Sequence, residues 1–154
     1  IQTARVLNEI DPGFIRVRTL VVNNKMPLYD EVENGNFIRA TDEDILKEER
    51  LLIENLECQS NYVSDHITNL LQEIEGKLPQ DKEKMLATID RFQALSPEER
   101  TNFRIGRRVG IYNQLDDLYD SGKRQTVERL THRLGLGSNE IDEKKIYRLM
   151  GRFI

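Results

Sequence analysis

The stretch that decides the predicted fold reads Phe14-Ile15-Arg16-Val17-Arg18-Thr19-Leu20-Val21-Val22. It follows Asp11-Pro12-Gly13, a combination that ends the short amphipathic helix expected over residues 4–10. Its β-branched residues favour a strand, and side chains alternate between the two faces of a strand. One face therefore carries Ile15, Val17, Thr19 and Val21, and the opposite face carries Phe14, Arg16, Arg18, Leu20 and Val22.

Helix and strand signals alternate after this stretch. The polar residues 23–36 predict a long loop, and Thr41-Asp42-Glu43-Asp44 then resembles a capping box that opens a helix over residues 41–56. Residues 59–64 are a weaker strand candidate, and residues 65–76 are predicted to form the next helix. This order favours βα units with parallel strands.

The second half of the sequence carries helix signals only. Pro79 begins one predicted helix, and Ser96-Pro97-Glu98-Glu99 supplies the N-cap, the first-turn proline and the N3 glutamate of another. Shorter helical segments are expected over residues 115–119 and 127–134. A last helix, capped by Ser138 or Asp142, would carry Ile146, Leu149, Met150 and Phe153. We therefore divide the chain into an α/β part, residues 1–76, and a helical part, residues 77–154.

Composition excludes several classes of protein. The chain has 154 residues with a formal charge of −4; residues 1–96 hold 11 basic and 18 acidic side chains, whereas residues 97–154 hold 12 and 9. No apolar run exceeds three residues, so no membrane span is predicted. Cys58 is the single cysteine, which excludes an intrachain disulfide and a set of thiolates for zinc or an iron–sulfur cluster. The first residues lack a signal peptide and an initiator Met, which favours a segment cut from a longer cytoplasmic protein.

Five short motifs carry a resemblance to a known family. They are Phe14-Ile15-Arg16-Val17-Arg18-Thr19-Leu20; Pro27-Leu28-Tyr29-Asp30-Glu31-Val32 with Gly35 and Phe37; Leu51-Leu52-Ile53-Glu54-Asn55-Leu56; Ser64-Asp65-His66 with Asn69; and Leu78-Pro79 with Asp81-Lys82. Together they make residues 11–108, about two-thirds of the chain, similar to the C-terminal part of radical S-adenosylmethionine (radical SAM) Fe–S oxidoreductases. The branch concerned is related to the oxygen-independent coproporphyrinogen oxidase and elongator-like groups.

The resemblance implies that residues 14–22 and 59–64 are the last two strands of a partial (βα)6 barrel, followed by a C-terminal helical region. The family's Cys-x3-Cys-x2-Cys motif is absent from this chain. A 4Fe–4S cluster and S-adenosylmethionine would accordingly bind in an N-terminal barrel portion of the parent protein. We expect this chain alone to be inactive, and the resemblance does not identify the substrate.

Two arginines are the first candidate site residues. In a parallel βα barrel, Arg16 and Arg18 would face the interior near the carboxyl end of a strand, where such enzymes gather their ligand-binding groups. A guanidinium there could pair bidentately with the carboxylate of S-adenosylmethionine or of an acidic substrate. The alternatives are that both arginines pair with acids of other strands or lie on a solvated face.

Asp65 and His66 are the second pair of candidates, at the end of the second strand. Histidine titrates near neutral pH and a neighbouring carboxylate raises its proton affinity, so the pair could transfer protons or orient substrate. The simpler alternative makes Asp65 the N-cap of the following helix. The sequence indicates no catalytic nucleophile and no metal-binding set.

A rival interpretation is a helical protein- or RNA-binding module without catalytic activity. Its partner would bind either the helix over residues 127–134 or a stripe of Arg100, Arg104, Arg107 and Arg108, which recur at helical spacing. Few aromatic residues accompany these arginines and acidic residues lie one turn away, which favours a solvated or salt-bridged face and argues against a nucleic-acid partner. Unpaired strand edges also predict a homodimer formed through residues 14–22 or 59–64.

Overall fold

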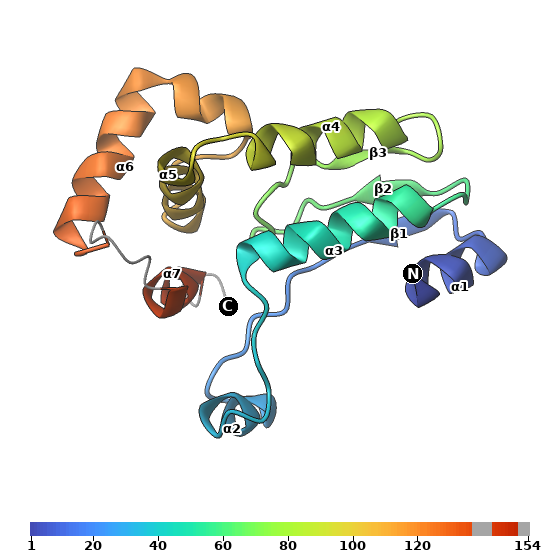
Figure 1. The fold of residues 1–154 in the computed structure, drawn as a ribbon, viewed down its shortest axis with the longest axis horizontal. Coiled ribbons are helices and arrows are strands. Elements are labelled where there is room, and N and C mark those ends of the chain that lie inside the picture. Colours follow the sequence, from blue (N-terminus) through green and yellow to red (C-terminus); the bar gives the residue numbers. More distant parts are fainter. Residues whose placement is uncertain (137–142, 151–154) are drawn as a thin grey trace.

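The computed structural model describes residues 1–136 and 143–150. Its elements are α1 (Gln2–Ile10), β1 (Phe14–Arg16), α2 (Leu28–Glu33), α3 (Asp42–Asn55), β2 (Asn61–Val63), β3 (Glu75–Lys77), α4 (Lys82–Gln93), α5 (Pro97–Arg108), the 3-10 helix η1 (Leu115–Tyr119), α6 (Ser121–Arg133) and α7 (Glu143–Met150). Figure 1 shows α5, α6 and α7 gathered at the opposite end of the molecule from α1. In the same view, α2 lies at the tip of two long connecting segments.

The sheet is small and mixed. β1 pairs with β2 in parallel, with Ile15 opposite Tyr62, and α3 connects the two strands. β3 pairs with the other edge of β2 in the antiparallel direction, with Tyr62 opposite Gly76. The predicted partial (βα)6 barrel is therefore wrong for this chain. Within the described residues only three strands form, each of three residues, and an antiparallel strand occupies the edge beyond β2.

The strand predicted over residues 14–22 ends at Arg16. The Val17 N–H still donates to the Val63 carbonyl at 3.1 Å. Beyond that point the backbone bonds to the Asn69 side chain, whose amide donates to the Val17 carbonyl at 3.0 Å and accepts from the Thr19 N–H at 2.7 Å. Because a side chain takes the hydrogen bonds that a neighbouring strand would take, the ladder stops.

The helix predicted over residues 65–76 is also wrong, since this segment forms turns and then β3. The carbonyls of residues 68–70 accept hydrogen bonds of 2.8 to 3.1 Å from Arg107 and Arg108. In a helix those carbonyls would accept from N–H groups four residues later. Asp65 therefore caps no helix, and its carboxylate is available to another partner.

The other helix predictions are confirmed. Thr41 and Asp44 form the capping box of α3, and Ser96 and Glu99 form that of α5 with Pro97 at its start. The predicted loop over residues 23–36 contains α2. The proposed caps of the last helix, Ser138 and Asp142, and its residue Phe153 lie outside the described residues.

The core lies on one face of the sheet. Ile15 and Tyr62 point into a cluster that α3, α4 and α5 complete with Ile53, Ile89 and Phe103. The opposite face of β1 exposes Phe14 and Arg16, so the alternation expected for this strand is confirmed. Within the described ranges, no helix combines the length and the apolar character needed to cross a membrane.

Candidate functional site

Four polar side chains meet at the carboxyl ends of β1 and β2, and we call Arg16, Arg18, Asp65 and His66 the strand-end cluster. Arg16 binds Asp65 bidentately, with its Nε 2.8 Å from Oδ1 and its Nη2 3.1 Å from Oδ2. An Nη2 group of Arg18 hydrogen bonds to Nε2 of His66. The structure thus brings together all four predicted site residues, because the parallel register places the two strand ends side by side.

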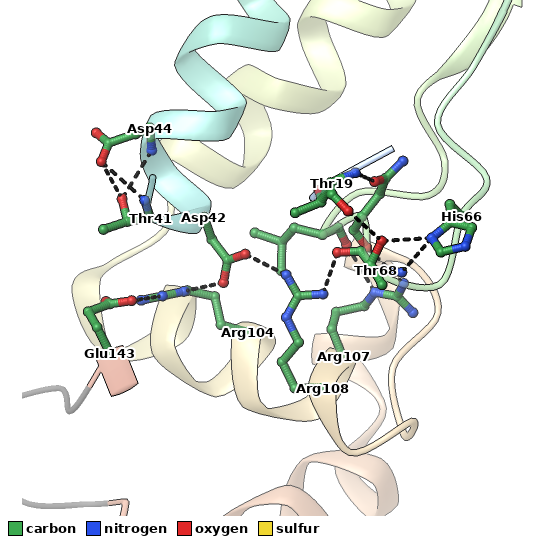
Figure 2. Close-up of polar contacts among 12 residues, drawn as sticks. Thr19, Thr41, Asp42, Asp44, His66, Thr68, Arg104, Arg107, Arg108 and Glu143 are labelled. Atoms are coloured by element: carbon green, nitrogen blue, oxygen red, sulfur yellow. Dashed lines mark hydrogen bonds and ion pairs between the residues drawn. The ribbon is translucent and has the colours of Figure 1, made fainter. Parts of the chain in front are cut away.

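Hydrogen bonds from two segments fix the His66 ring. A guanidinium only donates, so Nε2 of His66 accepts from Arg18 and the ring is a neutral imidazole. Nδ1 hydrogen bonds with the Thr68 hydroxyl at 2.7 Å and also lies 3.3 Å from the Thr68 N–H, and the hydroxyl contacts the Thr19 carbonyl at 3.2 Å (Figure 2).

Electrostatics favour the same protonation state. Desolvation, followed by the positive charges of Arg18 and Arg16, lowers the pKa of His66 below its ordinary 6.5, and Asp65 opposes them more weakly. His66 is therefore neutral at pH 7. It can take up a proton at Nε2 once a ligand draws Arg18 away from the ring.

The two arginines of the cluster differ in charge balance. The carboxylate of Asp65 neutralises Arg16, whereas Arg18 meets only a neutral imidazole. Among the described residues, no carboxylate forms an ion pair with Arg18. Arg18 can therefore bind an anionic ligand without first breaking an ion pair with a carboxylate of the protein.

Asn69 supports the cluster from beneath. It is buried, and its amide also donates to the Ser64 carbonyl at 3.1 Å, in addition to its bonds with residues 17 and 19. One side chain thus joins the end of β1 to the end of β2. The sequence marks Asn69 only as part of the family resemblance, and its bridging role was missed.

A second polar group is centred on two buried arginines, and we call Asp42, Arg104, Arg108 and Glu143 the buried arginine network, of which only Glu143 is exposed. Arg104 on α5 donates to Asp42 at 2.9 Å and forms a two-point pair with Glu143 on α7 at 2.8 and 2.5 Å. Arg108 binds the other oxygen of Asp42 (Figure 2). The network therefore connects the start of α3 to α5 and α7.

The carboxyl group of Asp42 is ionised in this setting. Burial alone would raise its pKa, but the charges of Arg108 and Arg104 and their hydrogen bonds outweigh burial and hold the pKa below 3.8. Arg108 also donates to the Thr68 carbonyl at 2.8 Å. Thr68 is thus the residue at which the buried arginine network contacts the strand-end cluster.

The basic stripe predicted on α5 is not an exposed surface. Arg104, Arg107 and Arg108 are 3%, 1% and 1% exposed. Arg107 donates to three backbone carbonyls, and burial lowers its pKa to about 10, which leaves it charged at neutral pH. Arg100, the remaining member, pairs with Glu43 at 3.3 Å. Arg104 and Arg108 thus form buried salt bridges with Asp42, Arg107 binds backbone carbonyls, and the pair of Arg100 reaches the surface.

Glu49 on α3 is a further ionisable group that sequence reasoning missed. It lines a cavity of about 450 Å³ between α3 and β1, and the Tyr62 hydroxyl donates to it at 3.0 Å. Burial raises its pKa to about 7, against the opposing effect of hydrogen bonds from Tyr62 and Ser64. Its position in the apolar stripe of α3 indicated burial, but nothing near it in the sequence indicated which groups would surround it.

The site can bind and orient anionic groups and can accept one proton. Among the described residues, no group of three or more His, Cys, Asp or Glu side chains is placed to hold a metal ion, and Cys58 is buried. No family model, curated protein or solved structure matches this chain. Its function must therefore be inferred from its own residues and from the resemblance stated above.

Proposed function

We propose that this chain is the C-terminal part of a cytoplasmic radical SAM enzyme, and that its strand-end cluster contacts the substrate or S-adenosylmethionine. The observation that carries the proposal is the position of the cluster. Two arginines, an aspartate and a histidine lie together at the carboxyl ends of adjacent parallel strands. Ligand-binding groups of α/β enzymes collect at those ends.

The residues that carry the family resemblance support this assignment. The motif Ser64-Asp65-His66 with Asn69 and the strand at Phe14 supply every member of the cluster and the side chain beneath it. Cys58 is the only cysteine of the chain, so its residues do not fit a 4Fe–4S cluster. We therefore assign the 4Fe–4S cluster and the reductive cleavage of S-adenosylmethionine to a preceding part of the parent protein.

An apolar surface beside β1 also supports the proposal. Within the described residues, no strand pairs with the outer edge of β1. Large apolar side chains of α1, β1 and α3 are exposed: Ile1, Val6, Ile10, Phe14 and Leu51. An unpaired strand edge next to exposed apolar groups favours a further packing partner. We assign this surface to the preceding part of the parent, with a second copy of the chain as the alternative.

The experiment uses the full gene product. We expect its reading frame to encode Cys-x3-Cys-x2-Cys before Ile1, and the protein reconstituted without oxygen to cleave S-adenosylmethionine to 5′-deoxyadenosine. Arg18→Gln should lower turnover by about 100-fold, a typical effect of losing an electrostatic contact in an active site. The matched variant Arg133→Gln, on the exposed end of α6, should leave turnover unchanged.

Two outcomes would contradict the proposal. One is a reading frame without the cysteine motif, and the other is a reconstituted protein that does not cleave S-adenosylmethionine. The rival RNA-binding module has little support from the structure, because three of the four arginines that suggested it are buried.

A further inference from the structure

A second cavity opens beside the strand-end cluster. It has a volume of about 530 Å³ and lies between residues 18–22, residues 32–41 and α7. Its apolar wall includes Leu20, Val32, Phe37, Ile38, Ile146 and Met150. Three of these side chains are exposed, with Leu20 at 55%, Phe37 at 38% and Ile38 at 88%. The cavity therefore offers apolar surface that residues 1–136 and 143–150 do not cover.

The same cavity is lined by cations. Arg18, Arg39 and Lys144 contribute to its wall, and in the part of the chain that the structure describes none of them pairs with a carboxylate. The Arg39 guanidinium lies 4.0 Å from the ring centroid of Tyr147. The Tyr147 hydroxyl accepts from the Val22 N–H at 2.5 Å, which fixes α7 against the opposite wall.

The acidic residues of the wall do not neutralise these cations. Asp42 binds both Arg104 and Arg108, and Glu143 binds Arg104, so two arginines balance these two carboxylates. Glu48 is the remaining carboxylate on the wall. Among the described residues, three cations without a carboxylate partner thus face one acid, and the cavity carries an excess of positive charge.

We propose that this cavity binds a small organic anion with an apolar body, such as an aliphatic carboxylate. The oxyanion would lie against Arg18 and Arg39, since a guanidinium pairs with a planar carboxylate through two hydrogen bonds. The apolar body would cover Leu20, Phe37 and Ile38. The volume falls within the range of roughly 300–1,000 Å³ that small-molecule sites occupy. The cavity shares Arg18 with the strand-end cluster, but the inference goes beyond the proposed function, because binding of the anion needs neither an iron–sulfur cluster nor S-adenosylmethionine.

The test compares octanoate with octan-1-ol, which has the same chain length and no charge. Calorimetric titration of the 154-residue chain should show saturable binding of octanoate and much weaker binding of octan-1-ol. Arg39→Gln should weaken octanoate binding about tenfold, the effect expected for loss of one charge-assisted hydrogen bond, and should leave the affinity for octan-1-ol unchanged. Arg133→Gln removes the same charge from an exposed site outside the cavity and should leave the affinity for both ligands unchanged.

A second measurement does not depend on a variant that folds. In the unaltered protein, octanoate should shift the backbone amide resonances of residues 18–22, 32–41 and 143–150. Equal affinity for octan-1-ol, resonance shifts outside these segments, or no saturable binding would each overturn the inference. Because the titration contains no cofactor, these outcomes are independent of whether the full gene product cleaves S-adenosylmethionine.

Discussion

The strand-end cluster and the buried arginine network both join guanidinium groups to a carboxylate from a distant part of the chain, but Asp65 of the first is exposed to water and Asp42 of the second is not. Arg16 and Asp65 are each 49% exposed as side chains, whereas those of Arg104 and Arg108 are 4% and 1% exposed beside an Asp42 at 6%. Solvent stabilises the exposed charges even when they are separated. The buried charges depend on each other, because removal of one partner leaves the other unsolvated.

This difference separates two roles for the same residue type. The buried pairs join α3 to α5, and removal of one partner would leave a charge without solvent or counterion. The exposed pairs contribute little to folding, so their arrangement can serve a ligand without loss of stability. Three measurements test this comparison.

The largest effect is expected for Asp42→Asn. It leaves Arg104 and Arg108 buried without a carboxylate that both can share. The free energy of unfolding, measured by urea denaturation, should fall by about 3–5 kcal/mol. The control Asp44→Asn alters an exposed acid on the same helical turn and should cause a much smaller loss. If both variants lowered the free energy of unfolding by the same amount, burial would not determine how much these charges contribute to stability.

An intermediate effect is expected for Glu49→Gln, which tests a partly buried carboxyl on α3 that pairs with no arginine among the described residues. The folded pKa of about 7 exceeds the ordinary value of 4.5, so the folded state binds more protons between those values. The protonated Glu49 carboxyl therefore stabilises the folded state at pH 4.5. As the pH rises to 7 this contribution is lost, and the free energy of unfolding falls by on the order of 2 kcal/mol. Glu49→Gln should remove this pH dependence and stabilise the protein at pH 8.

The control for this prediction is Glu48→Gln, a change at the exposed neighbouring position. Urea denaturation at pH 5, 6, 7 and 8 supplies the comparison. A pH profile that is the same in Glu49→Gln as in the unaltered protein would show that Glu49 does not gain a proton on folding.

The smallest effect is expected at the strand-end cluster. A double-mutant cycle of Arg16→Gln and Asp65→Asn should give a coupling energy below about 1 kcal/mol in urea denaturation, as for other exposed ion pairs. The coupling energy should fall further in 1 M NaCl, because the Debye length shortens to about 3 Å and salt screens the attraction between the two charges. A coupling as large as the effect of Asp42→Asn would remove the distinction between the two regions.

Local signals in the sequence were sufficient for the helix starts and for the candidate residues. Thr41 and Ser96 cap helices through groups three residues away, which short-range patterns specify. Arg16, Arg18, Asp65 and His66 were identified from their positions at strand ends, and the parallel pairing of those strands brings them together.

Long-range contacts account for the errors. Residues 65–76 have the apolar spacing of a helix, but guanidinium groups about 40 residues later take the carbonyls that a helix needs. The helical spacing of the α5 arginines does not reveal that Asp42, on another helix, neutralises two of them. The barrel was implied by the resemblance, and no pattern within these residues could show that an antiparallel strand would follow β2.

Thr68 has a consequence for the chemistry of His66. Its carbonyl is held by Arg108 in the interior, while its hydroxyl and its N–H both contact Nδ1 of the imidazole. A valine at this position would keep the same shape and the backbone bonds but would remove the hydroxyl from the ring. A residue that helix α5 anchors therefore positions the imidazole, so a change in the packing of Arg108 would alter the surroundings of a histidine at the surface.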